Sequence, residues 1–380
     1  MTLSLDMNEL LTEATKNTDL NDFGDPGFKV GLEEILKTYD NNNLTEAGKK
    51  SSRDRLLSIL QVRLNIENAW KCYPEILEEE VIAPMFLTGM PRTGTSALVN
   101  LLAKDTAARP MKMWEGLNPN PLPGNPPEQE DPRFLAMKAA MEELNLDPAR
   151  AALHFSVADG PEECIHLTNH TFIDVQYGVE CYMEPYATFF RQVDRKPIYE
   201  YHHNLLRMLQ WQRPGDRWLL KAPYHLWSLD LLVDHYPDCS IINTHRNPLE
   251  AVGSYCSMME KLMPERENID KIDLGLRVFT YLADQVDLSM KVRKSIDPTR
   301  VLDIHFKDFL VTPMQSVEQI YNYFNLPMSN KTLSNFSDYI TNHPAGKHGK
   351  HEYKLADYGL SEQQVLDRFS KYIDTYKIAI

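Results

Sequence analysis

Apolar and polar positions follow two different periods along this chain. In residues 1–80 the apolar positions recur at helical spacing, for example at Leu56, Leu60 and Leu64, and this spacing predicts helices. From residue 84 onward, short apolar runs appear that end at a glycine, a proline or a charged residue, as is typical of buried strands. The pattern therefore predicts a helical N-terminal extension, residues 1–80, followed by a second domain, residues 81–380.

Four apolar runs in the second domain predict strands. They cover residues 84–89, 217–220, 240–244 and 301–306. Helical patterns lie between them and fill much of 134–212, whereas 118–133 contains six prolines and is predicted to be an irregular loop. Buried strands that alternate with helices predict an α/β fold, with a mostly parallel sheet flanked by helices.

Composition narrows the class of protein. The 380 residues are 43% hydrophobic and 25% charged, which is typical of a soluble globular protein. No apolar run is long enough to cross a bilayer, and the N-terminus does not resemble a secretory signal. Five scattered cysteines without a CxxC pair indicate a reducing, cytoplasmic location. A net charge of −14 disfavours nucleic acid as a partner, so we expect a small molecule and no membrane. The oligomeric state, including a homo-oligomer, stays open.

The first candidate site follows the first predicted strand. Its sequence is Gly89-Met90-Pro91-Arg92-Thr93-Gly94-Thr95-Ser96. The glycine spacing matches the phosphate-binding P-loop G-x-x-x-x-G-K-[ST], whose backbone N–H groups bind phosphate oxygens together with the following helix N-terminus. Here Thr95 stands in the lysine position, and the cation lies instead on the turn, at Arg92.

These departures change the predicted ligand. No Walker-B aspartate is evident after a later strand, so a magnesium-bound triphosphate is disfavoured. A short anionic group such as a phosphosulfate suits the loop better, with Arg92 as an electrostatic clamp. The hydroxyl groups of Thr93, Thr95 and Ser96 are further candidate donors, and Pro91 and Gly94 complete the predicted binding turn. The alternative is an ordinary glycine turn between a strand and a helix.

A second candidate site follows the 240–244 strand. Arg246 lies at the strand's end, Pro248 suits the first turn of a new helix, and Ser254 lies on that helix. The arginine and the serine are predicted to bind a second phosphate, although alone they also fit a solvated arginine and a helix serine. A P-loop enzyme needs no second anion site, whereas a donor with an extra 3′-phosphate does.

The motifs resemble those of a known family. GMPRTGTS is similar to the phosphosulfate loop of sulfotransferases that use 3′-phosphoadenosine-5′-phosphosulfate (PAPS), and closest to the bacterial-type branch whose loop reads PR-[ST]-G-T. RWLLKAPYHLWSLDLL and INTHRNPLEAVGSYCSM resemble their 3′-phosphate region. The resemblance spans roughly residues 20–378. It implies a P-loop-like fold, PAPS as donor, adenosine 3′,5′-bisphosphate as product, and no metal.

Several residues are candidates for the base that accepts the acceptor's proton. Glu115 lies at a separation from the loop similar to that of a base in glycan sulfotransferases, with Trp114 beside it. His225 lies near the position of a histidine in the cytosolic enzymes, although an insertion changes its spacing. His154 is a third candidate. For each of the three, the alternative is a structural or solvated side chain.

Other polar residues complete the predicted site. Lys221, after a predicted strand, is expected to stabilise or protonate the leaving phosphate. Glu162 and Glu163 are further candidates for binding the acceptor. The basic, glycine-broken segment Gly346-Lys347-His348-Gly349-Lys350-His351 is predicted either to close over the nucleotide or to be a solvated tail. His166 and His170 are four residues apart but lack the partners that a zinc site needs.

The sequence thus favours a PAPS-dependent sulfotransferase acting on a small-molecule hydroxyl or amine. Two alternatives remain open at this point. One is a nucleotide kinase or NTPase with a degenerate P-loop, and the other is a nucleotide-binding protein without catalysis. The sequence does not identify the acceptor.

Overall fold

The computed structural model describes residues 5–42, 44–146, 157–177, 184–262, 269–343 and 353–380. Within these ranges, five parallel strands form one sheet. In order across the sheet they are β2 (Ala108–Pro110), β3 (Arg217–Lys221), β1 (Met85–Gly89), β4 (Ser240–His245) and β5 (Val301–His305). The four predicted strands are confirmed. The additional strand, β2, is too short to show an apolar period of its own.

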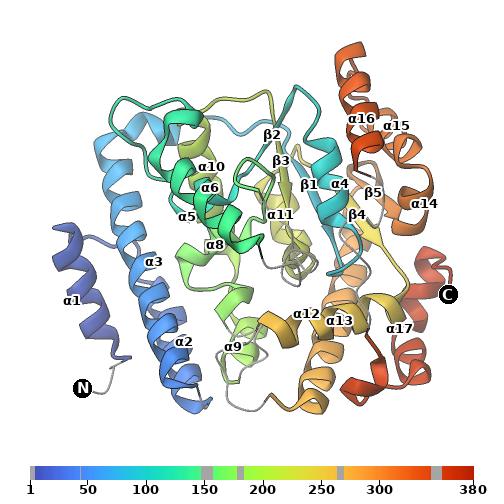
Figure 1. Ribbon diagram of the computed structural model, residues 1–380, viewed down its shortest axis with the longest axis horizontal. Coiled ribbons are helices and arrows are strands. Elements are labelled where there is room, and N and C mark those ends of the chain that lie inside the picture. Colours follow the sequence, from blue (N-terminus) through green and yellow to red (C-terminus); the bar gives the residue numbers. More distant parts are fainter. Residues whose placement is uncertain (1–4, 43, 147–156, 178–183, 263–268, 344–352) are drawn as a thin grey trace.

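Helices cover both faces of the sheet (Figure 1). Alternate side chains of β1 enter two different clusters, because successive residues of a strand point to opposite faces. Met85 and Leu87 pack with α4 (Thr95–Leu102), α14 (Phe306–Val311), α15 (Pro313–Tyr323) and α16 (Asn330–Asn342). Phe86 packs in the larger cluster with α10 (Lys196–Gln212), α11 (Leu229–His235), α12 (Pro248–Leu262) and α13 (Lys271–Val292). The predicted α/β fold with a parallel sheet is confirmed.

The described residues of the segment 5–80 are largely helical, as predicted. Their helices are α1 (Met7–Thr18), α2 (Phe28–Asn41) and α3 (Glu46–Cys72). Their buried apolar side chains belong to the same cluster as Phe86 of the sheet. The guanidinium of Arg63 in α3 also donates a 2.9 Å hydrogen bond to the carbonyl of His170. The N-terminal helices therefore pack directly onto the rest of the protein and share its core.

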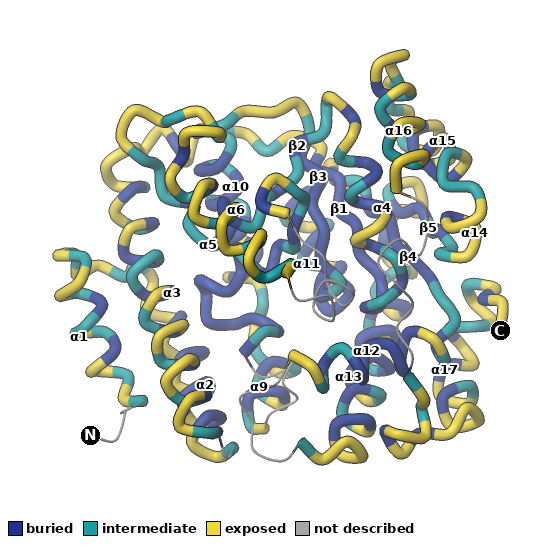
Figure 2. The backbone as a smooth tube through the Cα atoms, in the orientation of Figure 1, coloured by how far each residue is buried: buried dark blue, intermediate teal, exposed yellow. Residues whose placement is uncertain are grey.

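The remaining helices lie between and around these layers. They are α5 (Met113–Leu117), α6 (Pro132–Leu144), α8 (Ile165–Thr168), α9 (Tyr186–Gln192) and α17 (Glu362–Tyr376). The segment predicted to be an irregular loop contains a short 3-10 turn, Glu128–Glu130, ahead of α6. In Figure 2 the strands are buried and the outer helix faces are exposed. No helix in the described ranges is both long enough and apolar enough to span a bilayer.

The strand register brings the candidate site together. Leu87 of β1 pairs with Lys221 of β3, and Gly89 pairs with Thr244 of β4. The carboxyl ends of these three neighbouring strands therefore meet at one edge of the sheet. This edge is where ligands bind in open parallel sheets, and the P-loop-like turn and Arg246 both follow from it.

Candidate active site

The turn after β1 has a backbone shaped for close approach. Arg92 and Gly94 both have left-handed φ angles, 70° and 92°. A Cβ at Gly94 would lie 2.2 Å from a ring carbon of Phe306, so glycine is required there. Thr95 then begins α4, whose first N–H groups have no partner within the helix. The turn and the helix end together form a site for an anion.

The hydroxyl groups of this turn have different surroundings. Thr93 is buried, and its Oγ1 donates to the carbonyl of Met90 at 2.6 Å and lies 2.6 Å from Oγ1 of Thr244. The Thr93 side chain therefore fastens the turn to β4, in contrast to the prediction that it is a free donor. Thr95 and Ser96 line a cavity, and their hydroxyl groups stay candidate donors.

The two predicted anion sites lie side by side. Nε of Arg92 donates to Oγ of Ser254 at 3.0 Å, and Nη1 of Arg246 donates to the carbonyl of Arg92 at 2.9 Å. Arg246 also lies over the Phe306 ring, 4.7 Å from its centroid. Burial and then the nearby Arg246 charge lower the pKa of the Arg92 guanidinium. Two cations held this close favour an anion between them.

A lysine and a glutamate meet beside the turn. Lys221 ends β3 and is 1% exposed, and its Nζ donates to Oε1 of Glu163 at 2.7 Å and to Oγ of Ser96 at 3.3 Å. An isolated β-bridge pairs Glu163 with Lys221, which fixes the two backbones relative to each other. Lys221 thus lies between the predicted phosphosulfate turn and a carboxylate, as a group that stabilises a leaving phosphate requires.

A cavity of about 710 Å³ lies beside these residues, and Ser96 and Glu163 line it, whereas Lys221 is not among the described lining residues and reaches it only through its contacts with these two. Its wall includes Pro91, Arg92, Gly94, Thr95, Ser96 and Arg246 from the two predicted anion sites. Glu162, Glu163 and His166 contribute further polar groups. The apolar part of the wall includes Met113, Met141, Leu144, Val175, Met258 and Leu262. A charged end and an apolar body in one cavity suit a reaction between an anionic donor and an apolar acceptor.

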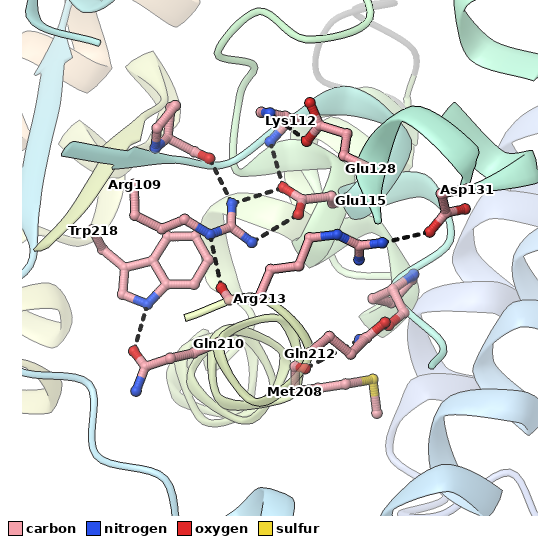
Figure 3. Close-up of polar contacts among 12 residues, drawn as sticks. Arg109, Lys112, Glu115, Glu128, Asp131, Met208, Gln210, Gln212, Arg213 and Trp218 are labelled. Atoms are coloured by element: carbon pink, nitrogen blue, oxygen red, sulfur yellow. Dashed lines mark hydrogen bonds and ion pairs between the residues drawn. The ribbon is translucent and has the colours of Figure 1, made fainter. Parts of the chain in front are cut away.

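Glu115 does not lie where a base is needed. The carboxylate is 1% exposed, and both of its oxygens accept from Arg109, at 2.8 and 2.7 Å (Figure 3). The backbone N–H of Lys112 also donates to it, at 3.2 Å. Glu115 is absent from the described residues that line the cavity. The geometry therefore assigns Glu115 a structural role and does not support the prediction that it is the base.

The Glu115–Arg109 pair gives a stability prediction. Glu115→Gln keeps the size of the side chain but leaves the Arg109 charge uncompensated, so the free energy of unfolding should fall by about 3 kcal/mol. Urea unfolding measures this change. Glu46→Gln, at an exposed ion pair with Lys49, should change it by less than about 1 kcal/mol. A large loss of kcat in Glu115→Gln without a loss of stability would restore Glu115 as the base.

His225 is part of the core. It is fully buried, its Nδ1 lies 3.0 Å from the Tyr199 hydroxyl, and its ring meets Phe86 edge-on at 5.2 Å. Burial lowers the pKa of this imidazole to about 3. The residue is not among those described as lining the cavity. The alternative of a packed histidine therefore fits, and the prediction of His225 as the base is not supported.

This buried histidine makes stability depend on pH. Below its ordinary pKa of 6.5, the unfolded chain binds a proton that the folded ring does not bind until about pH 3. The free energy of unfolding should therefore decrease as the pH is lowered through this range, by up to about 1.4 kcal/mol per pH unit for this ring. His225→Gln should flatten the pH dependence of urea unfolding, whereas His343→Gln, at an exposed site, should not. An unchanged slope in His225→Gln would contradict a neutral buried ring.

Some predicted residues cannot be placed. His154 and the basic segment with Lys347, His348, Gly349, Lys350 and His351 lie outside the described residues. Their predicted roles stay predictions. Within the described ranges, no group of three or more His, Cys, Asp or Glu side chains is arranged to hold a metal ion. Nε2 of His170 instead lies 3.0 Å from the Gly116 carbonyl.

The fold and the site define an enzyme class. A parallel sheet with a P-loop-like turn, a cation on that turn and a second arginine beside it provides a site for the anionic groups of a nucleotide. A model of the sulfotransferase family matches residues 84–330. The chain belongs to this family and is a sulfotransferase.

Named relatives and solved structures agree with this assignment. The chain is 24% identical over 313 residues to omega-hydroxy-beta-dihydromenaquinone-9 sulfotransferase Stf3 of Mycobacterium bovis, covering 78% of this chain and 76% of Stf3. The fold is similar to sulfotransferase STF9 of Mycobacterium avium, with a TM-score of 0.91, 26% identity and coverage of 100% and 99%. Sulfotransferase STF1 of Mycobacterium tuberculosis H37Rv has a similar fold, with a TM-score of 0.85 and 29% sequence identity. The match covers 96% of this chain and 98% of STF1. The family implies a sulfate donor such as PAPS.

Proposed function

We propose that this sulfotransferase moves a sulfuryl group from PAPS to a hydroxyl or amine of a small, partly apolar acceptor and releases adenosine 3′,5′-bisphosphate. The observation that carries the proposal is the meeting of the β1 turn, Arg92 and Arg246 in the wall of one largely apolar cavity, with Ser254 hydrogen-bonded to Arg92. The bound donor supplies an activated sulfuryl group on a phosphate leaving group.

The residues fit such a donor. The left-handed turn at Gly94, which the Phe306 ring packs against, leads into the N-terminus of α4, where free N–H groups suit an anion. We assign this turn and the Ser96 hydroxyl to the phosphosulfate, and Arg246 with Ser254 to the 3′-phosphate. Arg92 contacts both of the latter residues, and its charge suits either anion. Two half-buried guanidinium groups gain more from a bound anion than two solvated arginines would.

Two groups are assigned to the chemistry. Lys221 Nζ, beside Ser96, stabilises negative charge on the leaving phosphate oxygen. Glu163 lines the cavity as the partner of Lys221, and we propose it as the base that accepts the proton of the acceptor hydroxyl. Glu162 also lines the cavity, and its Oε2 accepts from the Glu163 backbone N–H at 3.1 Å. This bond suits a role for Glu162 in orienting the base.

The acceptor is proposed from the apolar wall. Methionine and leucine side chains from α5, α6 and α12 face the cavity, and they favour an apolar body next to the reacting group. The name of the relative Stf3 gives an omega-hydroxy menaquinone derivative as its acceptor. For this chain we propose the same general chemistry, a hydroxyl on an apolar body.

Donor binding tests this proposal directly. Calorimetry should detect adenosine 3′,5′-bisphosphate without magnesium, and Arg246→Ala should weaken its binding by about 10- to 100-fold, because a charged hydrogen bond to phosphate is lost. Arg277→Ala, at a half-exposed ion pair on α13, should bind normally. Unchanged binding by Arg246→Ala would overturn the second anion site. Tight ATP binding that requires magnesium would favour a kinase-like nucleotide site instead.

Location and assembly are also proposals. The buried thiols of Cys164, Cys239 and Cys256 are free, and free thiols support a reducing cytoplasm. Negative net charge supports a small molecule as the partner in preference to nucleic acid. A homo-oligomer stays a possibility that sedimentation would test.

A further inference from the structure

A second cavity adjoins the first on the side of the N-terminal helices. Its volume is about 500 Å³. Among the described residues, His166, Gln176, Met259 and Leu262 line both cavities. α3 closes the second cavity with residues that include Ser58, Ile59 and Val62. A molecule held in the first cavity can therefore extend past His166 toward α3.

The second cavity contains buried polar atoms that lack partners. Among the described residues, Oδ1 of Asn169 and Nδ1 of His170 have no hydrogen-bond partner, although their residues are only 2% and 1% exposed. Both residues line the second cavity. An unsatisfied buried acceptor is costly, at about 1–3 kcal/mol, and is uncommon in folded proteins. With Nδ1 of His166, three such atoms belong to residues that line this one cavity, and they indicate a place prepared for a ligand atom.

The protonation of the His170 ring determines which kind of ligand atom can bind to its Nδ1. Its Nε2 lies 3.0 Å from the Gly116 carbonyl, which only accepts, so Nε2 carries the proton. Burial lowers the pKa of His170 to about 4, and the ring is neutral at pH 7. Nδ1 is therefore an acceptor, as is Oδ1 of Asn169. A ligand that satisfies these two acceptors supplies a hydrogen-bond donor.

Charge narrows the ligand further. Arg55 also lines this cavity and donates to Oε1 of Gln176 at 2.5 Å. A cationic ammonium would lie near this guanidinium without a described carboxylate in the lining, so a neutral donor is favoured. Ile59, Val62 and Leu117 supply apolar parts of the same lining. A hydroxyl on an aliphatic or aromatic body meets both requirements.

We infer that the second cavity binds the end of the acceptor remote from the sulfated group, and that this end carries a neutral hydrogen-bond donor, a hydroxyl in the simplest case. The acceptor would then be an elongated molecule with an apolar middle and a polar group at each end. Asn169 and His170 would determine specificity for the distal group. This inference rests on the proposed function for the position of the reacting end.

Binding of matched probes tests the inference. The probes are α,ω-alkanediols and their monomethyl ethers, which differ only in the distal hydroxyl hydrogen, over a range of chain lengths. Calorimetry on the full chain loaded with adenosine 3′,5′-bisphosphate should show an optimum length at which the diol binds about five- to tenfold more tightly, after correction for its two equivalent ends. Asn169→Leu should remove most of this preference. Asn65→Leu, at an exposed site on α3, should retain it.

A second variant tests the inference independently, in case Asn169→Leu does not fold. Ser58 is exposed on α3 but lines the cavity, so Ser58→Trp should fold and fill the cavity. It should weaken binding of the long diols at least tenfold and leave short alcohols unchanged. Equal affinity for diols and ethers in the native chain, or unaltered long-diol binding in Ser58→Trp, would overturn the inference. A retained diol preference without any sulfation by PAPS would contradict the proposed function alone.

Discussion

Lys221→Met should lower kcat by about two to three orders of magnitude. Its Nζ lies between Ser96 of the turn and the carboxylate of Glu163, and methionine has a similar length without the charge. A preorganised cation aimed at developing negative charge contributes about 10²- to 10³-fold to a rate. Because Lys221 is buried, this cation acts in surroundings that screen it weakly. Single-turnover kinetics with PAPS measure the chemical step.

Controls separate catalysis from folding and donor binding. Lys138→Met, at an exposed position on α6, should leave kcat unchanged. Lys221→Met should still bind adenosine 3′,5′-bisphosphate, because Arg92 and Arg246 remain. Its midpoint of thermal unfolding identifies any loss of structure that follows from the unpaired Glu163. Normal kcat in a folded Lys221→Met variant would place the leaving phosphate elsewhere.

The sheet could be predicted because its signals are local. Each predicted strand is a short apolar run that ends at a polar or glycine residue, and parallel strands buried on both faces give such runs. Pro248 likewise predicted the beginning of α12, because the fixed φ angle of proline suits the first position of a helix. β2 had no such signal, since it spans only Ala108–Pro110.

The sequence did not reveal which ionic side chains pair in the folded protein, and this limited the prediction of the catalytic base. Glu115 has a suitable separation from the turn, yet Arg109 takes both of its oxygens. The arginine lies only six residues away in the chain, but nothing in the sequence alone showed that the two side chains pair. Glu163 reaches Lys221 across 58 residues through a β-bridge. No local pattern reveals that contact, so the sequence indicated Glu163 only as a candidate for binding the acceptor.

The two anion sites show the same limit at longer range. Arg92 and Ser254 are 162 residues apart in the chain and share a hydrogen bond. The sequence identified both residues as candidate anion ligands, but it placed them at opposite ends of a nucleotide. Their direct contact arises because β1 and β4 are neighbours in the sheet. The contact between the two sites therefore depends on the order of the strands in the sheet, and no single segment of the sequence encodes that order.

Glu163→Gln should lower kcat by about 10²- to 10³-fold while the KM for PAPS changes little. Glutamine preserves the shape of the side chain and a contact with Lys221, but it cannot accept the proton of the acceptor hydroxyl, and general base catalysis contributes about 10²- to 10⁴-fold. Steady-state kinetics with a simple alcohol measure the loss. Glu115→Gln should retain kcat in its folded fraction, since its carboxylate is paired with Arg109 away from the cavity.

A change of acceptor distinguishes a base from a positioning group. A nitrophenol gives up its proton readily and needs little help from a base, so Glu163→Gln should lose far less activity with it than with an alcohol. Loss of the Lys221–Glu163 ion pair alone would slow both acceptors equally, because Lys221 acts on the leaving phosphate in each reaction. Equal losses of activity with the two acceptors would therefore show that Glu163 positions Lys221 and is not the base. Glu162→Gln would then be the next variant to compare, since Glu162 is the other carboxylate described in the cavity wall.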